Sequence, residues 1–113
     1  KWLSEAVKSQ DFLDAKFKVV IAHMPPLPDE DLWHGQAEVA EKFVPILNEG
    51  GVDVMLCGHL HQYFNNKPTE KVRFPVIDNS SNTVLKGVVQ EDKLYLEIKN
   101  MNGDIVDKIY INH

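Results

Sequence analysis

Two short apolar runs of this sequence are each followed by histidine. These two runs restrict the possible folds more than any other feature. Lys18–Pro26 reads Lys-Val-Val-Ile-Ala-His-Met-Pro-Pro, and Val52–Tyr63 reads Val-Asp-Val-Met-Leu-Cys-Gly-His-Leu-His-Gln-Tyr. In open α/β sheets, ligands bind beyond the carboxyl ends of the strands, so His23, His59 and His61 can meet only if the two runs are neighbouring strands. Imidazole is a common ligand for zinc, iron, nickel and copper, and the pattern therefore predicts a metal site.

The segment between the two runs connects them in a way that makes them neighbours. Gly35–Asn48 has helical periodicity, and a glycine pair beginning at Gly50 is typical of a helix end. The order strand, helix, strand predicts a βαβ unit with parallel, adjacent strands. Pro45 marks either a kink or a restart of the helix. Phe17–Ala22 is apolar on both faces, which predicts a strand covered on both sides.

The flanking segments are expected to pack around this unit. Lys1–Ala15 has apolar residues at helical spacing, including Trp2, and predicts an amphipathic helix that frays or turns near Gln10–Asp14. Pro25–Trp33 contains three prolines followed by acidic residues, which predicts a stiff loop. His34 follows this loop directly, so its imidazole can overhang the strand ends.

The second half of the chain has the alternation of β-strands. Gln62–Arg73 is polar and is predicted to be an exposed loop, with Phe74–Asp78 as a short strand after it. The predicted fold class is α/β of the α+β kind, with a βαβ portion in residues 1–63 and a β-rich scaffold portion in residues 64–113. The scaffold is an antiparallel meander of three predicted strands, Val84–Gln90, Lys93–Lys99 and Ile105–Ile111.

The composition excludes several classes of function. The 113 residues suffice for one domain or part of one, and 43% hydrophobic and 26% charged residues are typical of a globular domain. The formal charge of -5 argues against duplex nucleic acid or an anionic membrane surface as the main partner. No apolar run is long enough to span a membrane. The single cysteine, Cys57, excludes an internal disulfide and is predicted to be buried in its strand.

Taken together, these residues resemble a known family. A His-Met-Pro block at His23 after an apolar strand, then a helix, then the Gly-His-Leu-His block beginning at Gly58 is similar to the C-terminal half of the calcineurin-like metallophosphoesterases. Within that superfamily the purple acid phosphatase-like branch is most similar, because it also has a histidine and a tyrosine at the positions of His34 and Tyr63. The resemblance covers residues 2–63 and includes the meander only loosely. It implies one half of a two-sheet sandwich flanked by helices.

The resemblance also implies an activity and roles for individual residues. His23 and His59 would ligate one metal and His61 the other, with two ions of iron, zinc or manganese in all. The two ions would hold a phosphate-ester substrate and a bridging hydroxide that attacks phosphorus. His34 would contact the phosphate or protonate the leaving alkoxide, and Tyr63 would contact the substrate. The purple-branch likeness implies an extracytoplasmic setting.

The chain departs from the family pattern at its beginning. The family's N-terminal half supplies Asp-x-His, Gly-Asp and Gly-Asn-His blocks, including the carboxylate that bridges the two metals, and none of them precedes His23 here. The chain also begins at Lys1 without an initiator methionine, so we expect a piece of a longer protein. Such a piece is expected to be inactive alone, to need its N-terminal half as partner, and to self-associate through an exposed apolar sheet face.

Two alternatives remain open. One is a non-catalytic module that holds a single zinc or nickel ion through His23, His59 and His61, with Cys57 as a conceivable fourth ligand. The other is an α/β half-domain whose histidines bind nothing.

Overall fold

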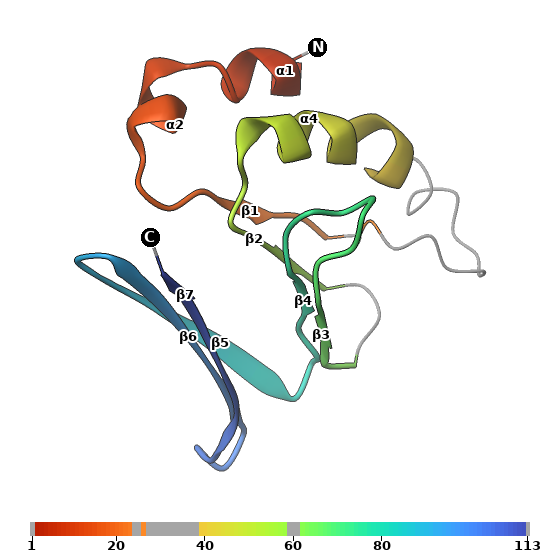
Figure 1. Cartoon of the computed structure of the whole chain (residues 1–113). Coiled ribbons are helices and arrows are strands. Elements are labelled where there is room, and N and C mark those ends of the chain that lie inside the picture. Colours follow the sequence, from red (N-terminus) through yellow and green to blue (C-terminus); the bar gives the residue numbers. More distant parts are fainter. Residues whose placement is uncertain (1, 24–25, 27–38, 59–61, 113) are drawn as a thin grey trace.

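The computed structural model describes residues 2–23, 26, 39–58 and 62–112. In this part of the chain, helices lie on one side of a four-stranded sheet and a three-stranded sheet lies on its other side (Figure 1). The strand orders are β1-β2-β4-β3 and β5-β6-β7. The elements are α1 (Trp2–Ala6), α2 (Gln10–Asp14), β1 (Val19–Ile21), the π-helical turn η1 (Val39–Phe43), α4 (Val44–Gly50), β2 (Val54–Cys57), β3 (Phe64–Asn66), β4 (Val76–Asp78), β5 (Thr83–Gln90), β6 (Lys93–Asn100) and β7 (Ile105–Asn112).

The two histidine runs form parallel, adjacent strands, as predicted. β1 pairs in parallel with β2, with Val20 opposite Met55. β4 pairs in parallel with the other side of β2, and β3 pairs antiparallel with β4. The helix between β1 and β2 ends at Gly50 and is capped by Gly51, whose φ of 74° is in the left-handed region that favours glycine.

Pro45 marks a restart of the helix. The chain makes a π-helical turn over Val39–Phe43 and continues as the α-helix α4, with Pro45 in its first turn. Because proline has no N–H group, it cannot donate the α-helical hydrogen bond to the carbonyl of Glu41. The wider turn before it follows from this missing bond.

The prediction of one N-terminal helix is wrong, because α1 and α2 are separate helices. The second helix spans Gln10–Asp14, where fraying or a turn was predicted. Ser9 explains the break, since its Oγ donates to the Ala6 carbonyl at 2.8 Å and accepts from the Phe12 N–H at 3.3 Å. Trp2, predicted to lie on the packed face, is 76% exposed.

The prediction of an exposed loop over Gln62–Arg73 is also wrong in part, because β3 lies within it. The backbone of β3 pairs with β4, and Asn66 Nδ2 donates to the Val76 carbonyl at 3.1 Å. These tertiary hydrogen bonds outweigh the low strand propensity of asparagine.

Two apolar clusters hold the layers together. In the meander-side cluster, Val54 and Ile77 of the four-stranded sheet pack against Leu94 and Leu96 of β6. The partly buried Leu3 and Phe12 of the N-terminal helices pack against the other cluster, which joins α4 to the sheet. This helix-side cluster consists of Val7, Val44, Leu47, Val52, Met55, Cys57, Val72, Phe74 and Val76.

The prediction that the first strand is covered on both sides is wrong. Val19 is 41% and Ile21 is 80% exposed. Both lie opposite residues of β2, Val54 and Leu56, that face the meander. Since β1 is the edge strand of its sheet, the meander covers β2 but leaves these two side chains accessible.

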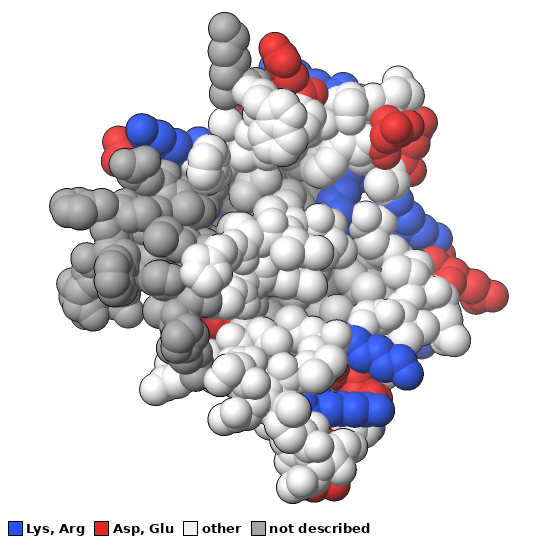
Figure 2. Space-filling model, turned by 180° about the vertical axis from the view of Figure 1, so that it is seen from behind, with Lys and Arg blue, Asp and Glu red and all other residues white. Residues whose placement is uncertain are grey.

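On the face of the molecule seen in Figure 2, charged side chains lie mostly around the margin.

The antiparallel meander is confirmed, and each of its strands is one residue longer than predicted. Gly103 has a φ of 87° in the turn between β6 and β7, where the Asn-Gly pair predicted a turn. None of the helices in the described part of the chain is long and apolar enough to cross a membrane.

Candidate metal centre

The hydrogen bonds of the four-stranded sheet continue past the ends of its parallel strands. The Gly58 N–H donates to the His23 carbonyl at 3.0 Å. The Asn79 N–H donates to the Cys57 carbonyl at 2.8 Å. The segments that leave β1, β2 and β4 therefore stay side by side at one edge of the sheet, called the carboxyl edge below. This is where ligands of open α/β sheets bind.

Of the predicted metal ligands, His23 is the one that the structure describes. Its side chain is exposed, and its Nδ1 lies 3.8 Å from the point where a Cβ on Gly58 would stand. Gly58 directly precedes His59, so the two histidine blocks begin next to each other. His34, His59 and His61 lie outside the described residues, and their roles stay predictions.

Tyr63 connects this region to the meander. Its hydroxyl donates to Asp107 Oδ2 on β7 at 2.7 Å, and its ring packs against the meander-side cluster. The hydrogen bond holds the pKa of Asp107 below its ordinary value. Burial, followed by the bond to this carboxylate, raises the pKa of Tyr63. The contact of Tyr63 with substrate stays a prediction.

Asp78, at the end of β4, is a candidate site residue that the sequence reasoning missed. It is fully buried, its Oδ2 accepts from Asn66 Nδ2 at 3.2 Å, and within the described residues its Oδ1 has no hydrogen-bond partner. Burial raises the pKa of this carboxyl group to about 6. In the register of the sheet, Asp78 lies opposite Cys57, which is two residues before His59 in the sequence. The signal in the sequence was a potential metal ligand directly after an apolar run, since Asp78 follows Val76 and Ile77 as His23 follows the first run.

Cys57 is buried, as predicted, and belongs to the helix-side cluster. Burial, and secondarily the Asp78 carboxylate, raises the pKa of its thiol to about 12. Zinc binds the thiolate form of cysteine. The burial of Cys57 among the apolar side chains of this cluster disfavours it as the fourth ligand of a mononuclear site.

The described side chains do not make a complete metal site. Among them, no three His, Cys, Asp or Glu residues lie close enough together to hold an ion. The His23 imidazole and the Asp78 carboxylate come from the carboxyl edge, and donors of these two types suit zinc, iron or manganese. The family pattern includes a Gly-Asp block that supplies the site. The Gly-Asp pair of this chain, Gly103-Asp104, lies instead in the β6–β7 turn of the three-stranded sheet. A metal site here therefore needs ligands beyond the described residues.

The fold and its histidine-bearing edge define a class: mixed α/β proteins with candidate metal ligands beyond the carboxyl ends of parallel strands. The family model for calcineurin-like phosphoesterase matches residues 1–63, more than half of the chain. The chain belongs to the calcineurin-like phosphoesterase family, and this membership indicates phosphoesterase chemistry. The family typically binds two metal ions. No curated protein matches the chain.

Proposed function

We propose that the chain is the C-terminal part of a dinuclear metal-dependent phosphoesterase of the purple acid phosphatase-like branch, acting on a phosphate monoester or diester. The observation that carries this proposal is the hydrogen bond between the Gly58 N–H and the His23 carbonyl. It holds His23, which begins the His-Met-Pro block, beside Gly58, which begins the Gly-His-Leu-His block. The family match over residues 1–63 includes both blocks.

In this proposal His23 and His59 bind one metal ion and His61 binds the other. Neutral imidazoles hold a cation without cancelling its charge. Such ions, when bound, neutralise phosphate charge and lower the pKa of water towards neutrality. His34 follows the proline loop after His23, and it contacts the phosphate or protonates the leaving oxygen. Tyr63 also contacts the substrate in this proposal.

The carboxylate ligands come from an N-terminal half that these 113 residues do not contain. The exposed edge strand supports this part of the proposal, because Val19 and Ile21 present an apolar surface that further strands of the same domain would cover. Without a bridging carboxylate, the three histidines cannot hold two ions. The 113-residue chain alone is therefore expected to have little or no phosphatase activity.

Metal binding to the chain tests the ligand assignment. In calorimetric titrations with zinc, replacing His23, His59 or His61 by alanine should each weaken binding by at least about tenfold. His113→Ala is the matched control, since the proposal does not use that histidine, and it should leave the affinity unchanged. Equal affinities for all four variants and the wild type would refute the assignment.

Turnover and upstream sequence test the need for the missing half. With zinc, manganese or iron added, the chain should hydrolyse p-nitrophenyl phosphate no faster than its metal-free form. The reading frame upstream of Lys1 should encode Asp-x-His, Gly-Asp and Gly-Asn-His blocks after apolar strands. Metal-dependent turnover close to that of an intact enzyme would overturn this part of the proposal.

A further inference from the structure

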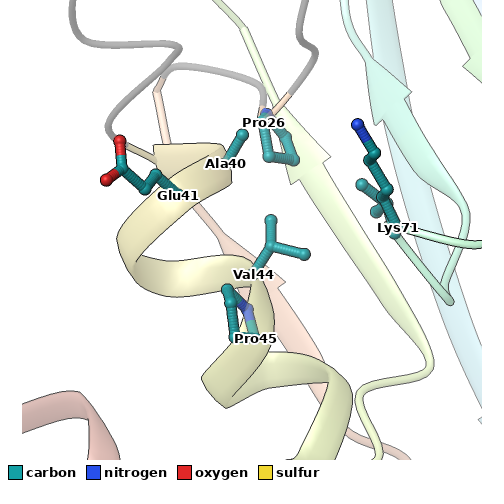
Figure 3. A pocket seen from close by; sticks show the side chains of 7 residues that line it. Pro26, Ala40, Glu41, Val44, Pro45 and Lys71 are labelled. Atoms are coloured by element: carbon teal, nitrogen blue, oxygen red, sulfur yellow. The ribbon is translucent and has the colours of Figure 1, made fainter.

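A pocket with apolar walls lies between the beginning of the η1–α4 helix and the segment that precedes β4 (Figure 3). Its volume is about 460 Å³, within the range of pockets that bind small organic molecules. Its walls come from Pro26, Ala40, Val44, Pro45 and Val72, and Glu41 and Lys71 are the charged residues among the described ones that line it.

The pocket lies close to the carboxyl edge of the sheet. Pro26 follows His23 by three residues, so their Cα atoms are at most about 11 Å apart. In a βαβ unit the helix starts from the carboxyl end of the first strand. The described part of this helix starts with η1, Val39–Phe43, and the first turn of α4, which begins at Val44. Four of the lining residues, Ala40, Glu41, Val44 and Pro45, therefore belong to the end of the helix that is nearer to the candidate metal centre.

The wall opposite the helix is held in place by hydrogen bonds. Asn48 of α4 donates through Nδ2 to the Lys71 carbonyl at 2.8 Å and accepts the Arg73 N–H at 2.9 Å. Thr69 donates its N–H to the Val72 carbonyl at 2.7 Å and accepts the Val72 N–H through Oγ1 at 3.1 Å. The pocket is thus formed before any ligand binds, as small-molecule sites usually are.

The charge that the pocket offers to a ligand is positive. In Figure 3 the Lys71 side chain extends towards the end of the pocket at which Pro26 lies. The Glu41 carboxylate points away from the pocket. None of the described carboxylates forms an ion pair with Lys71. A purely apolar ligand would make no electrostatic interaction with the ammonium group of Lys71. Inorganic phosphate would make no apolar contact with the pocket walls. A ligand with an apolar group and a phosphate charge uses both.

We propose that this pocket binds the apolar organic group of a phosphate ester, an aryl or branched alkyl group, with Lys71 facing the charge of the phosphate. The inference rests on the proposed function, whose substrate class it narrows. It distinguishes this chain from a phosphoesterase that recognises its substrate through the phosphate alone.

The first test is a mapping experiment on the wild-type chain in EDTA, by two-dimensional ¹H–¹⁵N NMR. The probe is benzylphosphonate, which cannot be hydrolysed, and methylphosphonate lacks only the aryl group. Benzylphosphonate should shift the amide signals of Ala40, Val44 and Val72 saturably, and methylphosphonate should shift them at least about tenfold more weakly. Saturable shifts confined to other residues, or no saturable shift, would overturn the proposal.

Variants then separate the two parts of the recognition. Ala40→Leu fills the pocket and should weaken benzylphosphonate binding by about tenfold or more. Lys71→Met should weaken benzylphosphonate but leave benzyl alcohol unaffected, and Lys67→Met, at an exposed position of the same segment, is the charge control. Equal weakening by the two lysine variants would refute the role of Lys71.

These outcomes are distinguishable from failure of the proposed function. The NMR experiment requires neither metal nor turnover, whereas the ligand assignment depends on zinc binding through His23, His59 and His61. Zinc binding without benzylphosphonate in the pocket would overturn only the substrate class. Benzylphosphonate binding without histidine-dependent zinc binding would overturn the metal site and leave an aryl-phosphonate pocket.

Discussion

Replacing Asp78 by asparagine should change how the stability of the chain depends on pH. Asp78 is fully buried, and burial raises the pKa of its carboxyl group to about 6. A carboxyl group with a higher pKa in the folded state binds its proton more tightly there than in the unfolded chain. Its contribution to stability is therefore complete below the unfolded pKa and is lost as the pH rises through the folded pKa.

The size of this effect follows from the two pKa values. A change from the ordinary 3.8 to about 6 corresponds to about 3 kcal/mol of unfolding free energy, lost mainly between about pH 4 and pH 6. Asparagine does not ionise, so the unfolding free energy of the variant minus that of the wild type should increase by about 2–3 kcal/mol between pH 4 and pH 7. A constant difference, such as the burial of the new amide, cancels in this comparison.

The assay is urea unfolding followed by circular dichroism at several pH values in this range, with EDTA present to exclude divalent ions. Asp104→Asn, at an exposed position in the β6–β7 turn, is the matched control for removal of one negative charge. A difference between Asp78→Asn and wild type that stays flat with pH would refute the raised pKa. A difference that decreases as the pH rises would mean that a cationic group pairs with Asp78 in the folded state.

Three further predictions concern stability and association. Gly51→Ala should lower the unfolding free energy by about 1 kcal/mol, because alanine is strained at a φ of 74°, and an unchanged urea midpoint would contradict the left-handed helix end. Tyr63→Phe should lower it by about 1 kcal/mol through loss of the hydrogen bond to Asp107, and an equal loss in a Tyr63→Phe, Asp107→Asn double mutant would confirm that the two changes remove one interaction. Ile21→Lys should reduce self-association in sedimentation experiments, because a charge on an edge strand opposes pairing with another chain. A wild-type chain that is monomeric at all concentrations would contradict the last prediction.

Local patterns predicted a large part of the fold. The three meander strands were found because alternation of apolar residues and turn residues such as the Asn-Gly pair act over a few positions. The parallel pairing of β1 with β2 followed from the order of elements alone. The break between α1 and α2 was misplaced, because the side chain of Ser9 caps the second helix and the apolar spacing continues across it.

For the candidate site, the sequence predicted that the two strands ahead of the histidine blocks are parallel neighbours, and the pairing of β1 with β2 confirms it. It did not predict that the hydroxyl of Tyr63 is bonded to Asp107, because the two residues are far apart in the chain and meet only when the sheets pack. Asp78 was missed for the same reason, since a carboxylate at a strand end is exposed unless other layers cover it.

The sequence by itself determined which side chains stand at the ends of which strands, because strand periodicity and helix ends are properties of neighbouring residues. It therefore determined the candidate ligand His23 and the family pattern around it. Only the tertiary structure decided that Asp78 is buried and Ile21 exposed, although both belong to short apolar strands. Burial depends on the layer that packs over a residue, and here the meander and the helices cover the centre of the sheet but leave one face of its β1 edge open.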